Sequence, residues 1–472
     1  FLLMLKVVKK YIYKLHFILL IFSSCNNEID NPLEEYVYGT DHEYSYEIVD
    51  SIIAEKWTGY HVKMISGNWL NQDLVDEVEW WHYVDIIIPN EVEFDKSLMF
   101  IDGGTKDEDF FRLDSTSISY AIKSKSIIAN ISNIPFQPIN FLESEQNAFY
   151  EDDLIAFSWN RFLKSGAKKN DVEWLPRLPM TRAVVRAMDL VQDIAQKNKI
   201  DVTEFVVSGA SKRGWTTWTT AAIDKRVIAI APMVIDMLNL NESLENHYRS
   251  YGEYSIAIQD YVNYNIPDWM VTKEFEILMK YVEPYYFKEK FTMPKLLINA
   301  GSDEFFSTDS WRFYFNELPG DKYLQYIPNV NHSLNGRYLN ENLFSFYTRI
   351  INDQVFPKLI WEIKNDSLIS RVVTNQDYKV SIWKANNEDT RDFRLWEEGK
   401  LWSQTPIDRN SLNKYKINLI NNNSGYTATM LEFIFNPDSE FPLILTTGPY
   451  VTPNKYPYDS YIPNRVDVIK ND

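Results

Sequence analysis

The chain has 472 residues, a length that predicts two or three domains. Hydrophobic residues make up 45% of the sequence and aromatic residues 15%, which is typical of a globular protein with a large core or aromatic-lined clefts. The 66 acidic residues outnumber the 48 lysines and arginines, and the formal net charge of -18 argues against a nucleic-acid partner.

The first 25 residues have the pattern of a secretory signal. Lysines between Lys6 and Lys14 precede an apolar run, residues 15–22, that is too short to span a bilayer. Cys25, the single cysteine of the chain, then stands where a bacterial lipoprotein carries its lipid. An ordinary signal peptide with an incidental cysteine is the alternative. We therefore expect a lipoprotein-type signal in residues 1–25 and an acidic tether in residues 26–35.

Residues 36–356 are expected to form the main domain, and its first strands are antiparallel. Alternation of apolar and polar side chains marks three of them, in residues 44–49, 60–66 and 81–89. A continuous apolar strand, residues 97–101, follows and ends in Asp102-Gly103-Gly104. Paired glycines after such a strand favour an oxyanion-hole donor at the backbone N–H of Gly104, and a plain β-turn is the alternative.

The segment Phe-Val-Val-Ser-Gly-Ala-Ser-Lys-Arg-Gly, residues 205–214, predicts a nucleophile elbow. An apolar strand runs into Ser211, and small residues before the serine leave room for the sharp turn that such a nucleophile needs. Gly214 stands one position later than the general Gly-x-Ser-x-Gly pattern requires. The backbone N–H of Lys212 would then be the other oxyanion donor. A serine in an ordinary strand–helix turn is the alternative.

The elements around this turn alternate between helix and strand. An amphipathic helix is expected after Pro179 and a buried strand in residues 227–235, which favours a doubly wound, mainly parallel sheet. Residues 238–291 lose the alternation and are rich in tyrosine and tryptophan. We expect this insertion to be a helical cap over the active-site edge, and an added packing layer is the alternative.

Two further strands complete a set of catalytic residues. Apolar strands at residues 295–300 and 322–327 are followed by Asp303 and His332. The chain order is therefore serine, aspartate, histidine, each beyond the end of a strand, which is the order of an α/β-hydrolase triad. Asp236 also follows a strand and is the alternative acid.

The residues at these positions resemble the PhoPQ-activated pathogenicity-related protein family. Matching sequence segments recur in order between about Tyr36 and about Phe356. They include Glu79-Trp80-Trp81-His82, Leu178-Pro179-Met180-Thr181, Gly-Ala-Ser-Lys-Arg-Gly-Trp from Gly209, Pro232 to Asn239, and Gly301 to Phe306. The resemblance implies an α/β-hydrolase fold with a serine nucleophile at Ser211, and it implies no substrate. The late Gly214 is this family's form of the elbow.

Residues 357–472 predict a small β-sandwich. Short β-like stretches alternate there with turns rich in asparagine and proline. We expect no metal, because His82 and His332 are far apart in sequence and no metal-binding spacing occurs. No phosphate-binding glycine loop is present in the sequence, and we expect no cofactor.

These features together predict a serine hydrolase that transfers an acyl group to water. An esterase acting on a small-molecule or carbohydrate ester is favoured, and a serine peptidase of the same fold or a non-catalytic secreted binding protein are the alternatives. Lys212 and Arg213 beside an aromatic cap would suit a substrate with an aromatic or acidic portion. Structural ion pairs are the alternative role of these two cations.

The N-terminal pattern also predicts a location. The protein would be held in the cell envelope by its lipid alone, or else be secreted. We expect the Cys25→Ser protein to leave the membrane fraction, because the lipid would have no attachment site. Fractionation of cells that express either form checks this, and a serine variant that stays with membranes would contradict it.

Overall fold

The computed structural model describes residues 32–39, 43–108, 113–336, 338–420 and 424–468. The predicted signal, Cys25 and the first part of the predicted tether lie outside these ranges. None of the helices within them is both long and apolar enough to cross a membrane.

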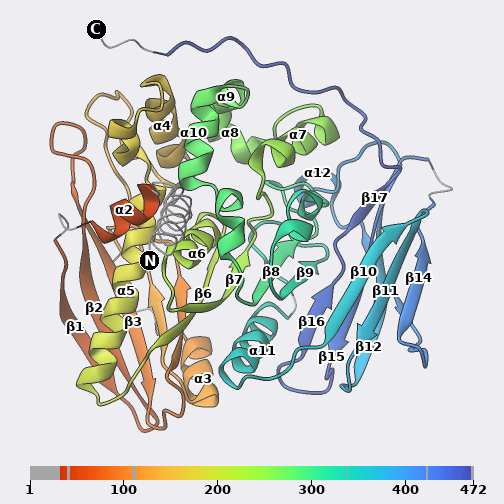
Figure 1. Ribbon diagram of the computed structural model, residues 1–472, viewed down its shortest axis with the longest axis horizontal. Coiled ribbons are helices and arrows are strands. Elements are labelled where there is room, and N and C mark those ends of the chain that lie inside the picture. The colour runs from red at the N-terminus through yellow and green to blue at the C-terminus, as the bar shows by residue number, and fades with distance from the viewer. Residues whose placement is uncertain (1–31, 40–42, 109–112, 337, 421–423, 469–472) are drawn as a thin grey trace, which may run out of the picture.

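A nine-stranded mixed sheet forms the centre of the molecule (Figure 1). Its strands lie in the order β1-β2-β3-β5-β4-β6-β7-β8-β9. They are β1 (Ser45–Ile53), β2 (Trp57–Asn68), β3 (Glu79–Pro89), β4 (Lys96–Ile101), β5 (Ile128–Ile131), β6 (Glu204–Ala210), β7 (Val227–Met233), β8 (Lys295–Ala300) and β9 (Lys322–Ile327). The pairings from β1 to β5 through β3 are antiparallel, and those from β5 to β9 are parallel. The expected mainly parallel α/β-hydrolase sheet is therefore confirmed.

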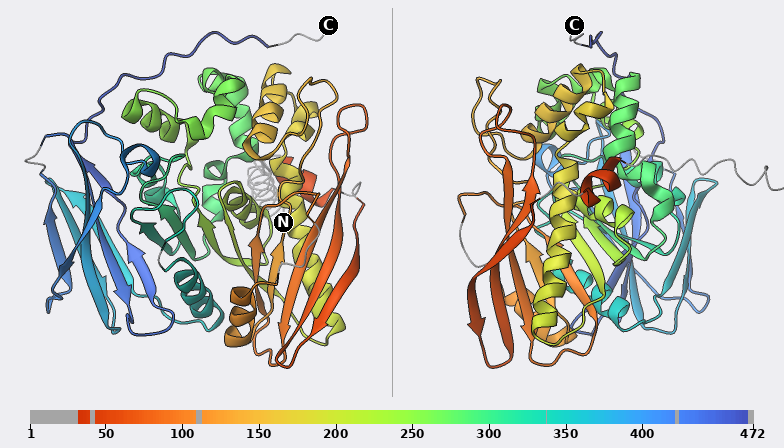
Figure 2. Two further views of the ribbon diagram at one scale, coloured as in Figure 1. Left: turned by 180° about the vertical axis from the view of Figure 1, so that it is seen from behind. Right: turned by 60° about the vertical axis from the view of Figure 1, so that its left-hand side comes forward.

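Helices cover both faces of this sheet, as a doubly wound fold requires (Figure 2). Successive residues of a strand point to opposite faces, so Phe205 and Val207 of β6 join one core cluster and Val206 joins the other. Helices α5 (Arg177–Lys197) and α6 (Lys212–Ile223) lie over the first face, and α3 (Ser115–Ser124) and α11 (Leu339–Ile351) contribute to the core on the second.

The end of the expected tether is part of the folded domain. Residues 32–35 begin helix α2 (Pro32–Tyr38), which packs against α5. Leu33 is fully buried and Val37 nearly so. Burial of these two apolar side chains stabilises the helix. The acidic residues beside them instead give the stretch the composition of a tether in the sequence.

Helices inserted between β7 and β8 form the expected cap over one edge of the sheet (Figure 1). They are α7 (Leu240–Tyr251), α8 (Gln259–Asn263), α9 (Ile266–Trp269) and α10 (Lys273–Val282), joined by the 3-10 turns Ile256–Ile258 and Pro284–Lys290. Helix α4 (Glu151–Lys164) packs on α8, α9 and α10 although it precedes them by about a hundred residues. The cap therefore draws on a second stretch of the chain, which contributes to the site described below.

The C-terminal part forms two antiparallel sheets, as expected. One has the order β10-β11-β14 and the other β13-β12-β15-β16, with β17 also paired to β15. Their bounds are β10 (Lys358–Lys364), β11 (Ser367–Val373), β12 (Tyr378–Asn387), β13 (Trp402–Ile407), β14 (Lys414–Asn418), β15 (Tyr426–Phe435), β16 (Leu443–Thr446) and β17 (Tyr450–Thr452), and α12 (Leu395–Glu398) is a single helical turn. Strand β16 packs beside β9, where Tyr326 N donates to Thr446 Oγ1 at 3.0 Å.

A buried polar cluster joins the C-terminal part to the cap and the hydrolase sheet. Arg391 donates to Asp309 Oδ2 at 2.6 Å and to Ser250 Oγ of α7 at 2.7 Å. Asn246 of the same helix donates to the other oxygen of Asp309. Burial by itself would raise the pKa of Asp309, but the guanidinium groups of Arg391 and Arg312 hold this pKa below its usual value.

The last described segment returns over the cap (Figure 1). Tyr461 Oη and Asn464 N each donate to Asp268 Oδ1 of α9 at 2.7 Å. The ring of Tyr461 packs against Tyr248 and Tyr254. Residues 453–468 thus fix α9 from outside, without a helix or strand of their own.

We expect Arg391→Ala to lower the free energy of unfolding by about 3 to 5 kcal/mol, because it leaves the carboxylate of Asp309 buried without its main cation. Arg391 and Asp309 are 2% and 1% exposed. Arg409→Ala is the matched control, since its pair with Asp377 is 3.0 Å long but exposed to solvent. Arg409→Ala should lower the free energy of unfolding by less than about 1 kcal/mol. Urea denaturation of both variants checks this, and equal losses would contradict it.

Candidate active site

Ser211 occupies a strained turn between β6 and α6. Its backbone has φ 57° and ψ -124°, a conformation that costs free energy for any residue with a side chain. The turn is tight: a Cβ atom on Gly209 would lie 2.8 Å from the carbonyl oxygen of Arg213. A Cβ atom on Gly214 would lie 2.9 Å from the carbonyl oxygen of Met233. The late glycine is therefore needed where the helix passes β7, and the geometry is that of a nucleophile elbow.

The structure brings Ser211, His332 and Asp303 together. The Oγ of Ser211 lies 2.8 Å from Nε2 of His332. The Nδ1 of His332 lies 3.1 Å from both carboxylate oxygens of Asp303. The histidine side chain is 14% exposed and the aspartate 3%, so the acid is buried behind the imidazole. This is the relative order of nucleophile, base and orienting acid in a Ser-His-Asp triad.

Neighbouring residues hold the imidazole in place. The ring of Phe305 lies 4.2 Å from that of His332 and the ring of Phe306 lies 5.6 Å from it, measured between centroids. The backbone N–H of His332 donates to Glu304 Oε2 at 3.0 Å. Asp303 in turn accepts a hydrogen bond from the N–H of Phe305. The loop after β8 therefore positions both Asp303 and His332.

Asp236, the alternative acid, lies elsewhere in the network. Its carboxylate accepts hydrogen bonds from Tyr314, at 2.6 Å, and from Tyr326. Burial raises the pKa of Asp236 to about 7, and the nearby charge of Asp303 also raises it. Both of its oxygens are held by tyrosines, and the structure places Asp303 rather than Asp236 against the histidine.

The two expected oxyanion donors belong to neighbouring segments. A Cβ atom on Gly103 would lie 2.7 Å from the guanidinium of Arg213, so the loop after β4 touches the first turn of α6. Gly104 has φ 122°, and its carbonyl oxygen accepts from Gln137 at 2.8 Å. Lys212 begins α6. This arrangement suits two N–H donors aimed at one oxygen, and their role stays a prediction.

The cations after the nucleophile are engaged in ion pairs. Lys212 Nζ lies 2.9 Å from Glu151 Oε2 and 3.0 Å from Asp152 Oδ2. Arg213 binds the same Glu151 with two guanidinium nitrogens, and it also donates to the carbonyl oxygen of Ile134. Burial would raise the pKa of Glu151, but Lys212 and Arg213 lower it well below its usual value. These contacts favour the structural alternative for the two cations.

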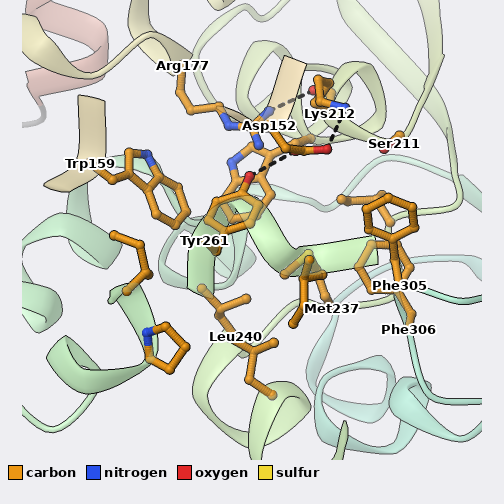
Figure 3. Close-up of a pocket in the computed structure, with 16 residues that line it drawn as sticks. Asp152, Trp159, Arg177, Ser211, Lys212, Met237, Leu240, Tyr261, Phe305 and Phe306 are labelled. Carbon is orange, nitrogen blue, oxygen red and sulfur yellow. Dashed lines mark hydrogen bonds and ion pairs between the residues drawn. The ribbon is translucent and has the colours of Figure 1, made fainter. Parts of the chain in front are cut away.

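A pocket opens beside Ser211 under the cap (Figure 3). It encloses about 620 Å³ when its opening to solvent is included. Ser211, Phe305 and Phe306 lie on one side of it, and Trp159 lies on the opposite side. Ile266 and Pro267 of α9 also line it, so the helix that the C-terminal segment holds is one of its walls. Concave, mostly apolar sites are the usual form of small-molecule sites.

Sequence reasoning missed two charged residues of this pocket, Arg177 and Asp152. Arg177 donates to the carbonyl oxygen of Lys212 at 3.0 Å, and its guanidinium lies 4.5 Å from the ring of Trp215. Tyr261 donates to Asp152 at 3.0 Å. The acidic run Glu151-Asp152-Asp153 at the start of a helix was the one signal for this cluster in the sequence. In the part of the chain that the structure describes, no cluster of three or more histidine, cysteine or acidic side chains could hold a metal.

The raised pKa of Asp236 predicts a pH effect on stability. The pKa is 3.8 for an ordinary aspartate and about 7 in the folded protein. Between these values the folded state keeps a proton that the unfolded state has lost. The stability that this group contributes is therefore complete below about pH 4 and is lost as the pH rises through 7.

We expect the free energy of unfolding of the natural protein to fall relative to that of Asp236→Asn between pH 4.5 and 7, by at most about 1.4 kcal/mol per pH unit. An asparagine cannot titrate, and other buried acids such as Glu283 change equally in both proteins. Urea denaturation at several pH values measures the difference. Curves that stay parallel over this range would show that Asp236 does not titrate there.

Comparison with solved structures gives distant likenesses. An acetyl xylan esterase from Paenibacillus sp. R4 is 13% identical, with a TM-score of 0.47, over 70% of this chain and 96% of that protein. Acetyl xylan esterase 1 from Thermoanaerobacterium sp. JW/SL YS485 is 12% identical, with a TM-score of 0.48, over 69% and 94%. Scores and identities this low give no argument about activity.

Comparison of sequences gives a much firmer result. The autocrine proliferation repressor protein A of Dictyostelium discoideum is 32% identical, over 94% of this chain and 94% of that protein. The model of the PhoPQ-activated pathogenicity-related protein family matches residues 33–394, from helix α2 through the hydrolase sheet and cap to Arg394. Since this match includes the elbow, the acid loop and the histidine, the chain belongs to the PhoPQ-activated pathogenicity-related protein family.

Proposed function

We propose that this protein is a serine hydrolase that transfers an acyl group to water, with Ser211 as nucleophile. The observation that supports this most directly is the continuous set of contacts from Ser211 Oγ through His332 to Asp303. Ser211 lines a pocket under the cap, and Phe305 and Phe306, which pack against His332, line it too. A serine on a strained turn, within hydrogen-bond reach of a base that an acid orients, is the usual form of an activated nucleophile.

The first half of the reaction forms an acyl-enzyme. Ser211 Oγ attacks the carbonyl carbon of the ester while His332 Nε2 takes the hydroxyl proton. Asp303, on Nδ1, keeps the imidazole in the tautomer that can accept it and stabilises the imidazolium. The bond between the carbonyl carbon and the leaving oxygen then breaks, and His332 gives the proton to that oxygen. An alcohol leaves, and the acyl group stays on Ser211.

The second half repeats these steps with water. His332 takes a proton from water, the hydroxide oxygen attacks the acyl carbon, and the bond to Ser211 breaks as the proton returns to Oγ. In both halves the N–H groups of Lys212 and Gly104 hold the negative oxygen of the tetrahedral intermediate. Such donors are each worth about 10²- to 10³-fold in rate.

An esterase is the favoured form of this activity, and amide hydrolysis by a peptidase would use the same first step. A p-nitrophenyl ester and a p-nitroanilide with the same acyl group separate them, because they differ only in the leaving atom. Faster turnover of the anilide would assign a peptidase. Absence of turnover of both, together with no labelling of Ser211 by a fluorophosphonate, would favour a binding protein on a hydrolase scaffold.

We expect Ser211→Ala and His332→Ala to lower kcat/KM for an activated ester by about 10⁴-fold or more, since they remove the nucleophile and its base. Asp303→Asn should cause a loss of similar order, because the amide favours the wrong tautomer of the histidine. Asp236→Asn is the matched control and should stay within about tenfold of the natural protein, as its carboxylate does not touch His332. Steady-state kinetics checks the set, with thermal unfolding as evidence of folding. Full activity of Ser211→Ala would refute the mechanism.

A further inference from the structure

The walls of the pocket beside Ser211 are apolar over most of their extent. Side chains from four parts of the chain meet there: Trp159 of α4, Trp215 of α6, Leu244 of α7 and Ile266 of α9, with Phe305 and Phe306 at the end near His332. Trp159, Trp215 and Ile266 are almost fully buried. A group that enters this space loses contact with water and gains contact with aliphatic and aromatic surface.

The charged side chains of the pocket are already paired with one another. Asp152 is bound by Lys212 Nζ and by the hydroxyl of Tyr261. Lys212 also binds Glu151, which Arg213 engages from its other side. A substrate carboxylate at Lys212 would meet the like charges of these two protein carboxylates, or would have to displace one of them. Like-charge repulsion and the loss of an existing ion pair both cost free energy, so this site disfavours an anion.

Arg177 is the remaining cation of the pocket, and its position limits what it can bind. One nitrogen donates to the carbonyl oxygen of Lys212, and the guanidinium lies over Trp215. Its Nε has no hydrogen-bond partner in the described residues, yet that atom is buried from solvent. Arg177 is 3% exposed. It therefore serves to hold the start of α6, while an incoming carboxylate would first have to move it.

We propose that this pocket binds an uncharged apolar or aromatic group of the substrate, joined to the ester that Ser211 attacks. This inference rests on the proposed hydrolase function and narrows it. The sequence left open whether the substrate carries an aromatic or an acidic portion, and this inference selects the aromatic or apolar one. The group is either the acyl part or the alcohol part of the ester, because Ser211, which attacks the bond between them, lines the pocket.

Four small esters test the proposal, with acid release followed by titration at constant pH. Methyl acetate leaves the pocket empty. Methyl hexanoate carries a six-carbon apolar acyl chain, and hexyl acetate carries the same chain on the alcohol. Monomethyl adipate matches methyl hexanoate in length but ends in a carboxylate. We expect kcat/KM for one of the two apolar esters to exceed that for methyl acetate by about 100-fold or more. Monomethyl adipate should be at least about 100-fold worse than methyl hexanoate if the acyl chain is the one bound.

A variant of the cap locates the effect in this pocket. Leu244→Trp fills part of the pocket from α7, and we expect it to lower kcat/KM for the favoured apolar ester by about tenfold or more while methyl acetate changes little. Ile256→Trp is the matched control, because Ile256 belongs to the same cap, is 65% exposed and does not line the pocket. Thermal unfolding and labelling of Ser211 by a small fluorophosphonate verify that each variant is folded.

The outcomes separate this inference from the function on which it rests. If none of the esters is hydrolysed and Ser211 is not labelled, the hydrolase function itself fails. If methyl acetate is hydrolysed as well as both methyl hexanoate and hexyl acetate, the hydrolase function stands and the apolar pocket is refuted. The same holds if methyl hexanoate is the favoured ester and monomethyl adipate is hydrolysed as well as it is. The comparison among these substrates uses the natural protein alone, so it decides the matter even if Leu244→Trp does not fold.

Discussion

The strained backbone of Ser211 is the constraint on which the rest of the site depends. A residue other than glycine keeps a backbone φ of 57° only if the surrounding structure fixes this conformation. Here Gly209 and Gly214 admit the close approach of α6 to β6 and β7, and Arg177 binds the first carbonyl of that helix. The hydroxyl is thereby fixed above the sheet edge, where the loops after β8 and β9 bring the acid and the base.

The ion pairs beside the turn serve this positioning. Lys212 and Arg213 follow the nucleophile directly, and both are anchored to the start of α4 through Glu151. Because α4 packs on three helices of the cap, the same contacts tie the cap to the nucleophile helix. The pocket is therefore built from a polar side held by ion pairs and a larger apolar side. Its outer wall, α9, is held in turn by the C-terminal segment through Asp268.

Asp303 and Asp236 illustrate how surroundings rather than residue type assign a role. Both are buried carboxylates that follow parallel strands of one sheet. Asp303 faces an imidazole, and Asp236 faces two tyrosine hydroxyls. Burial raises the pKa of Asp236 to about 7, so this group can be neutral near physiological pH. Neutral hydrogen-bonded burial suits a structural acid, whereas an orienting acid must stay charged to stabilise an imidazolium.

The sequence by itself determined the sheet, the elbow turn at Ser211, and the serine and histidine that the proposed mechanism uses. Those features depend on local order: apolar strands with a reactive residue after each, and small residues where the turn is tight. It also placed the cap between β7 and β8. Only the tertiary structure decided which aspartate meets the histidine, because two acids after strands look alike until their partners are known. The tertiary structure also decided that Lys212 and Arg213 are paired, since their partner Glu151 lies about sixty residues away in the sequence. It decided as well that residues 32–35 are helical, since the helix is stabilised by burial against α5. A local run such as Glu151-Asp152-Asp153 shows that charges are present but not which distant residues they pair with, so long-range pairing and burial had to be read from the fold.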